Sequence, residues 1–150
     1  MNRISIEAAL EEVRNVYVDL AQRPVERSCT RQTTCCHFKL TGRTPYLTRG
    51  EAVLAAHALR ATGRKALPAN PDGACPLLNA ASGKCLMYDA RPFGCRTHFC
   101  AGAGGPLARR DVIDLIRRLE KVDVDLNGAA PRTLAAAVSE ALGDCARARR

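Results

Sequence analysis

The chain has 150 residues, of which 47% are hydrophobic and 25% are charged. These fractions are ordinary for a globular protein, so they exclude wholesale disorder, a collagen-like repeat and a coiled-coil rod. Lys and Arg outnumber Asp and Glu by 23 to 15, which gives a net charge of +8. Most of this charge is Arg dispersed along the chain, and the dispersal argues against nucleic acid as a partner.

The sequence also indicates the cellular compartment of the protein and the size of its core. No apolar run approaches the roughly 20 residues that cross a bilayer, and the N-terminal segment turns acidic before a signal-peptide core forms. We therefore expect a cytoplasmic protein with no membrane partner. In a reducing compartment, eight cysteines indicate metal or redox chemistry rather than disulfides. With three Phe, three Tyr and no Trp, the core of the single expected domain (residues 1–150) should be thin.

Two amphipathic helices are predicted in the first half of the chain. Apolar residues recur every three or four positions over 5–21, and Ser5 is placed to cap this helix. The second predicted helix, 49–62, opens at a capping box formed by Thr48 and Glu51 and stops at a glycine. These signals predict both the presence and the boundaries of the two helices.

Two further helices are predicted in the C-terminal region, about 107–147. A broad apolar stripe covers 108–126 and ends before Asn127 and its following glycine, a common helix stop. A final helix is expected over 132–147, with Pro131 suited to its first turn. The sequence therefore predicts about four helices in all.

The rest of the chain is irregular and rich in Cys, Gly and Pro. It comprises residues 28–44 and 65–106, the second of which carries five prolines, and together with the helix between them it forms a cysteine-cluster region at about 28–100. A loop of about 40 residues is rare in a compact domain unless something ties it down. We therefore predict a mainly α fold whose helices frame irregular loops that converge on a metal centre.

Seven of the eight cysteines fall in these loops and are candidate metal ligands. Thiolates are soft, anionic ligands for zinc, iron or an iron–sulfur cluster, and a flexible backbone lets several converge. The alternative is that the cysteines are small buried hydrophobes. We accept it only for Cys145, on the apolar side of the last helix, because little core is expected around the loops. The seven candidates are Cys29, Cys35, Cys36, Cys75, Cys85, Cys95 and Cys100.

The spacing of the cysteines is consistent with either zinc or iron as the metal. Zinc modules usually present Cys-x2-Cys pairs, and this chain has none. Seven thiols exceed the four of one zinc site, so an iron–sulfur cluster, two sites, or one site with a spare redox pair are all consistent with the count. His37 and His98 lie among the cysteines, and each is a candidate ligand, acid–base group or hydrogen-bond donor to a cluster sulfur.

These motifs resemble the YkgJ-type cysteine-cluster family, whose members are described as zinc- or iron-chelating proteins. The resemblance covers about residues 28–100 and is most specific in its second half. It is carried by Cys29, Cys35-Cys36, the Leu-Thr-x2-Glu segment at Leu47–Glu51, Cys75-Pro76-Leu77-Leu78, and Cys85-x2-Tyr88-x2-Arg91-Pro92-x2-Cys95-Arg96.

The resemblance implies roles for individual residues. Six cysteines would be metal ligands or would lie close to the metal as alternative ligands: Cys29, Cys35, Cys36, Cys75, Cys85 and Cys95. Arg96 and Tyr88 would hydrogen-bond sulfur or offset the negative charge of the site, although for Tyr88 loop packing is an equal alternative. The family's first segment commonly runs Cys-x2-Cys-x2-Cys-Cys, whereas Gln32 stands at the second position here. Cys100 or His98 would then supply the missing ligand.

Three functions are consistent with this pattern. The first is a metal-binding module in which zinc or iron orders the loops and transfers electrons or senses redox state. The second is an enzyme that uses the centre as a Lewis acid or electron donor to modify a protein or small molecule. The third is a structural metal domain whose basic surface binds a partner such as RNA. No recognisable phosphate loop, carboxylate pair or Ser/His/Asp set indicates a particular reaction or protein partner.

Overall fold

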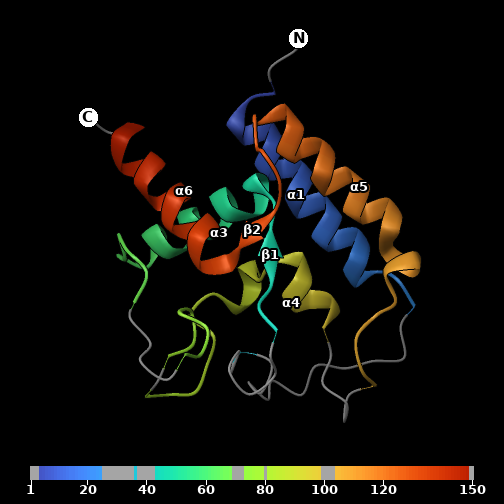
Figure 1. The fold of residues 1–150 in the computed structure, drawn as a ribbon, viewed down its shortest axis with the longest axis horizontal. Coiled ribbons are helices and arrows are strands. Elements are labelled where there is room, and N and C mark those ends of the chain that lie inside the picture. Colours follow the sequence, from blue (N-terminus) through green and yellow to red (C-terminus); the bar gives the residue numbers. More distant parts are fainter. Residues whose placement is uncertain are drawn as a thin grey trace.

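The computed structural model describes residues 4–24, 36, 43–68, 73–79, 81–98 and 104–148, and in these ranges the chain is mainly helical (Figure 1). The four long helices begin and end within about two residues of the predicted bounds. They are α1 (Ile6–Ala21), α3 (Arg49–Ala61), α5 (Arg109–Asp125) and α6 (Leu134–Ala148). The shorter elements are β1 (Tyr46–Leu47), the 3-10 helix η2 (Tyr88–Ala90), α4 (Phe93–Thr97) and β2 (Arg132–Thr133).

Helix α3 lies at the centre of the helical arrangement. It packs against α6, α1 and α5, while α1 runs beside α5 (Figure 1). The described residues of 73–98, coloured green to yellow, lie toward the lower end of the helices in this view. None of the helices in the described ranges combines the length and the hydropathy that a bilayer crossing requires.

The buried side chains form two clusters that share α3. One cluster joins α3 and α6 to the loop 74–87, and the other joins α1, α3 and α5 to Phe93 of α4. Val53 packs against both clusters. The cysteine-bearing loop is therefore part of the core and does not simply lie over it.

The expectation of little core around the loop cysteines is wrong for Cys75. Its exposed fraction is 6%, and Leu77, Leu78 and Met87 of the same loop are buried with it. These apolar residues do not recur in the sequence with the period of a helix or a strand, because turns rather than a regular element place them against the core. The core is therefore larger than composition alone suggested.

The predicted helix starts and stops are confirmed at three ends. Ser5 Oγ accepts a hydrogen bond from the Ala8 N–H (3.1 Å) at the start of α1. The capping box of Thr48 and Glu51 is present at the start of α3. Gly63, with φ +88°, follows the C-cap residue of α3, in a conformation that side-chain-bearing residues rarely adopt.

The start of the last helix differs from the prediction. Helix α6 begins at Leu134, three positions after Pro131, because Arg132 and Thr133 form strand β2 instead. This strand pairs antiparallel with β1, and the Leu134 N–H donates to the Pro45 carbonyl (3.0 Å). A two-residue strand has no detectable sequence period, so only its tertiary partner identifies it.

Asn127 ends α5 in a left-handed conformation, which leads to a prediction for its replacement. Its φ is +59°, and the Gly128 N–H donates to the Asp123 carbonyl (2.7 Å), as in a Schellman motif. We expect Asn127→Ala to lower the free energy of unfolding by about 1 kcal/mol, because alanine disfavours positive φ. Asn127→Gly should be neutral or slightly stabilising. Urea denaturation of both variants tests this, and equal stability of the two would contradict it.

Candidate metal centre

Cys75 and Cys85 lie on the two arms of a closed turn. The Leu78 N–H donates to the Cys75 carbonyl (3.0 Å), so the chain reverses immediately after Cys75. Leu78 then pairs antiparallel with Cys85, and the Leu86 N–H donates to the Leu77 carbonyl (2.7 Å). Cys85 is therefore held opposite a residue only three positions after Cys75.

The tip of this turn is closed by Asn79 and Gly83. The Asn79 Oδ1 accepts hydrogen bonds from the Ala81 and Ser82 N–H groups, and the Asn79 N–H donates to the Lys84 carbonyl (2.8 Å). Gly83 adopts φ +68°, which glycine tolerates without a steric cost. The polar and glycine residues that make this segment look irregular in sequence thus fix one particular turn.

Cys36 brings the first cysteine-rich stretch against the second. The Cys75 N–H donates to the Cys36 carbonyl at 2.6 Å, although the two residues are far apart in the sequence. Cys36 and Cys85 are partly buried against the core cluster that contains Cys75. The structure therefore brings the backbones of three predicted ligands to one edge of the α3–α6 core.

Cys95 lies on α4, the short helix that follows η2. Its N–H donates to the Pro92 carbonyl (3.0 Å), and the neighbouring Gly94 lies against Pro45, next to β1. Within the described ranges, no three His, Cys, Asp or Glu side chains form a group that could hold a metal ion. The remaining predicted ligands Cys29, Cys35 and Cys100, together with His37, lie outside the described residues.

Arg96 and Tyr88 stabilise the turn between η2 and α4. Arg96 donates through Nε to the Arg91 carbonyl and through Nη2 to the Asp89 carbonyl, both at 2.6 Å. The Arg91 guanidinium stacks over the Tyr88 ring, 3.8 Å from its centroid, and donates to the Tyr88 carbonyl (2.9 Å). Tyr88 thus makes the loop packing that was weighed as the alternative to a role at the metal.

The Arg96 guanidinium is also enclosed by the helical body. It lies 4.1 Å from the centroid of the Tyr17 ring on α1. Burial lowers the pKa of Arg96, while the nearby Tyr17 and Cys95 oppose that effect. A guanidinium remains protonated despite such a change. Arg96 therefore places a fixed positive charge next to Cys95.

His98 closes α4 as its C-cap residue and is partly buried. Burial and the nearby Arg43 both lower the pKa of the imidazole. Neutral imidazole is the form that binds metal ions. A ligand role for His98 stays a prediction.

Glu51 has a role beyond the capping box that the sequence predicted. Its carboxylate is 3% exposed and accepts four hydrogen bonds. Oε2 accepts from the N–H and Oγ1 of Thr48 (3.0 and 3.1 Å). Oε1 accepts from the Phe93 N–H of α4 (2.7 Å) and from the Tyr17 hydroxyl of α1 (3.2 Å). Glu51 therefore joins α1, α3 and the cysteine-bearing α4.

Burial dominates the electrostatics of this network. It raises the pKa of Glu51, and the hydrogen bonds from Thr48, Phe93 and Tyr17 oppose the rise. Burial and the adjacent Glu51 also raise the pKa of Tyr17 well above its ordinary value. The Tyr17 hydroxyl therefore stays protonated and acts as a donor. Tyr17 belongs to the apolar positions that recur along 5–21. The sequence signals for Glu51 are the capping box and the Leu-Thr-x2-Glu segment, and neither indicates its bonds to α1 and α4.

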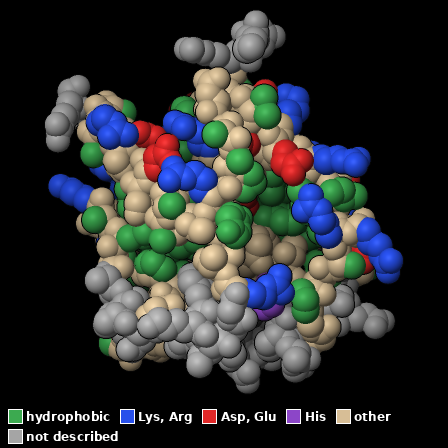
Figure 2. Space-filling view, viewed as in Figure 1, with side chains coloured by type: hydrophobic (Ala, Val, Ile, Leu, Met, Phe, Trp, Pro, Cys, Tyr) green, Lys and Arg blue, Asp and Glu red, His purple; other side chains and the backbone are tan. Residues whose placement is uncertain are grey.

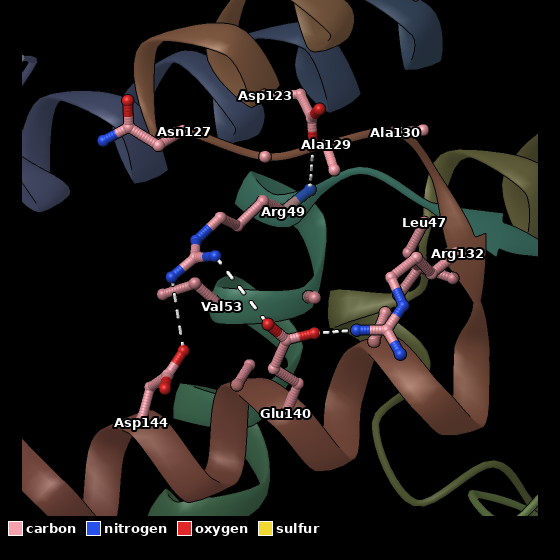
Figure 3. A pocket seen from close by; sticks show the side chains of 14 residues that line it. Leu47, Arg49, Val53, Asp123, Asn127, Ala129, Ala130, Arg132, Glu140 and Asp144 are labelled. Atoms are coloured by element: carbon pink, nitrogen blue, oxygen red, sulfur yellow. Dashed lines mark hydrogen bonds and ion pairs between the residues drawn. The ribbon is translucent and has the colours of Figure 1, made fainter.

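A pocket of about 190 Å³, with no cysteine among its lining residues, lies between α3, α6 and the end of α5 (Figure 3). Arg49 forms ion pairs with Asp144 (3.3 Å) and Glu140 (3.9 Å), and Arg132 also pairs with Glu140. The Arg49 N–H donates to the buried Asp123 carboxylate (2.7 Å). The ion pairs of Arg49 thus tie α3 to α6, and the hydrogen bond to Asp123 ties α3 to α5.

The surface charge is dispersed, as the composition suggested. Figure 2 shows Lys and Arg side chains spread over this face rather than gathered in one patch. Two arginines connect α1 and its C-terminal end to α5: Arg118 of α5 bonds Glu12 (2.7 Å) and Asp19 (2.5 Å) of α1, and Arg23 pairs with Asp114. Part of the excess positive charge therefore holds the fold together.

Comparison with known proteins identifies the family. Neither the curated proteins nor the solved structures gave a match. A model of the CxxCxxCC family, described as a putative zinc- or iron-chelating domain, matches residues 28–123. This match covers more than half of the chain and spans all seven candidate ligands, α3, α4 and most of α5. The chain therefore belongs to the CxxCxxCC family.

Proposed function

We propose that this chain is a metal-binding module whose loop cysteines hold zinc or iron. The observation that carries the proposal is the main-chain hydrogen bond between Cys36 and Cys75, with Cys85 on the adjoining turn. It joins two cysteine-rich stretches that are remote in the sequence. The proposed ligands are drawn from Cys29, Cys35, Cys36, Cys75, Cys85, Cys95 and Cys100.

The chemistry of this donor set fits the metals named by the family description. Thiolates suit zinc and iron far better than hard cations such as magnesium or calcium. Seven thiols also suffice for an iron–sulfur cluster, which needs four. The buried core on one side of Cys75 would limit water access, and Arg96 would offset part of the negative charge of the thiolates. A cluster would give the protein a redox function.

Metal binding would also complete the fold of the cysteine region. Between α3 and α5 the described chain contains only one turn of 3-10 helix and the five-residue α4. A structural zinc site contributes folding free energy on the order of 10 kcal/mol. We therefore expect the bound metal to stabilise the loops as well as to serve any redox function.

Anaerobic purification with metal analysis and an optical spectrum tests the proposal. We expect either a colourless protein with stoichiometric zinc or a brown protein with iron and acid-labile sulfide. The two results separate a zinc module from an iron–sulfur protein. A protein that keeps neither metal, even after expression with each supplied in excess and after anaerobic reconstitution, would contradict the proposal.

A further inference from the structure

Helix α4 depends on its neighbours for its position. It has only five residues, too few for a helix that is stable alone. Three contacts attach it to the helical body. The Phe93 side chain is buried in the core cluster of α1, α3 and α5, the Phe93 N–H donates to Glu51, and Arg96 stacks on Tyr17. Two of these contacts depend on Glu51 and Tyr17, which also bond each other.

We infer that Glu51 and Tyr17 are positioning residues of the metal centre, holding α4 so that Cys95 is placed to meet the other thiolates. The inference rests on the proposed function. Cys95 is only two positions after Phe93 and directly precedes Arg96, so a shift of either contact residue moves Cys95 as well. Groups that orient metal ligands commonly affect metal affinity by 10- to 100-fold.

A second buried carboxylate provides a control that separates the positioning of α4 from the capping of α3. Asp123 is 5% exposed and accepts the Arg49 N–H (2.7 Å) at the first turn of α3, close to the position that Glu51 caps. The group that donates to this carboxylate belongs to α3 and not to the cysteine-bearing segment. Asp123→Asn therefore perturbs a buried carboxylate at the same helix end while leaving the contacts of α4 in place.

Glu51 also offers a conservative replacement. In Glu51→Gln, the amide oxygen can still accept from Phe93 and Tyr17. The amide nitrogen then faces Thr48, where it can donate to Oγ1 but cannot accept from the Thr48 N–H, so this variant loses the capping bond and keeps the attachment of α4. Glu51→Ala removes the acceptor for all of these donors. Tyr17→Phe removes only the hydroxyl bond and keeps the ring beneath Arg96. The three variants therefore weaken the attachment of α4 to different extents.

The experiment is an anaerobic titration of the metal-free full-length protein with Co²⁺, a probe of thiolate sites. Affinity is measured by competition with a chelator, and the thiolate-to-cobalt charge-transfer band reports how many thiolates bind. We expect Glu51→Ala to weaken Co²⁺ binding about 10- to 100-fold and to reduce the band. Tyr17→Phe should weaken binding about 3- to 10-fold. Glu51→Gln and Asp123→Asn should keep the wild-type band and stay within about 3-fold of its affinity.

Two outcomes would overturn the inference. One is a wild-type band and affinity in Glu51→Ala, and the other is an equal loss in Asp123→Asn, which would reveal a general effect of destabilisation. Should Glu51→Ala not fold, Tyr17→Phe takes its place. A wild-type band and affinity in Tyr17→Phe, or an equal loss in Asp123→Asn, would then overturn the inference. A wild-type protein that binds neither Co²⁺ nor Zn²⁺ and keeps no iron after anaerobic reconstitution would instead reject the proposed function, and the inference with it. Should the wild-type protein bind iron alone, the iron content of the same variants after reconstitution replaces the Co²⁺ readout.

Discussion

Cys75→Ser is expected to lose most of the bound metal and to lower the free energy of unfolding by several kcal/mol. Cys75 is buried, bonded to the Cys36 carbonyl and part of the α3–α6 core cluster. A serine hydroxyl is a poor substitute for a soft thiolate ligand. Since a structural metal contributes on the order of 10 kcal/mol to folding, losing even part of its affinity is a large effect. Metal content and thermal unfolding of the purified variant measure it.

Cys145→Ser is the matched control for this prediction. Cys145 lies in α6 and packs, partly buried, against the same core cluster. The substitution therefore makes the same chemical change beside the same apolar side chains. We expect unchanged metal content and a loss of stability of about 1 kcal/mol or less. Full metal retention in Cys75→Ser would reject Cys75 as a ligand, and metal loss in Cys145→Ser would show that packing rather than ligation controls metal content.

Gly50→Ala is expected to lower the free energy of unfolding by about 1–3 kcal/mol, although alanine favours helices. A Cβ at this position would lie 2.7 Å from Val122 Cγ1 of α5 and 2.9 Å from Val13 Cγ2 of α1. Three helices meet there, so none can shift without disturbing the other two. Urea denaturation followed by far-UV circular dichroism, at constant metal content, measures the change.

Gly143→Ala provides the opposite case within the same protein. Gly143 lies inside α6, and its nearest neighbour would be an Arg147 side-chain nitrogen at 3.7 Å, an ordinary contact. The substitution should stabilise the protein by about 0.5–1 kcal/mol, because alanine loses less backbone entropy on folding. The prediction for Gly50 fails if Gly50→Ala is at least as stable as the wild type, and the prediction for Gly143 fails if Gly143→Ala is less stable than the wild type.

The long helices were predictable because their signals are local. The apolar spacing of α1 and α5 and the capping residues Ser5, Thr48 and Glu51 specify helices without reference to the rest of the chain. Strand β2 was not predictable, because Arg132 and Thr133 become a strand only when they meet β1. Where local signals are absent, tertiary partners decide the structure.

The same distinction applies to the candidate site. Cysteine spacing indicated which segments bear the candidate ligands, but it could not predict that the Cys36 carbonyl meets the Cys75 N–H, because loop paths have no periodic signal. Glu51 was visible as a cap of α3. Its bonds to Tyr17 and Phe93 require the prior packing of α1 and α4, which no local pattern encodes.

The sharing of α3 between the two buried clusters has a consequence for dissection of the protein. The cysteine-bearing loop rests on α6 from one end of the chain, and α4 rests on α1 from the other. A peptide limited to residues 28–100 would lack both α6 and α1. The apolar side chains of the loop and of α4 that pack against these helices would then be exposed to water. Unlike a zinc finger, the proposed metal centre is not expected to fold as a short autonomous segment, and minimal versions for engineering will have to retain nearly the whole polypeptide.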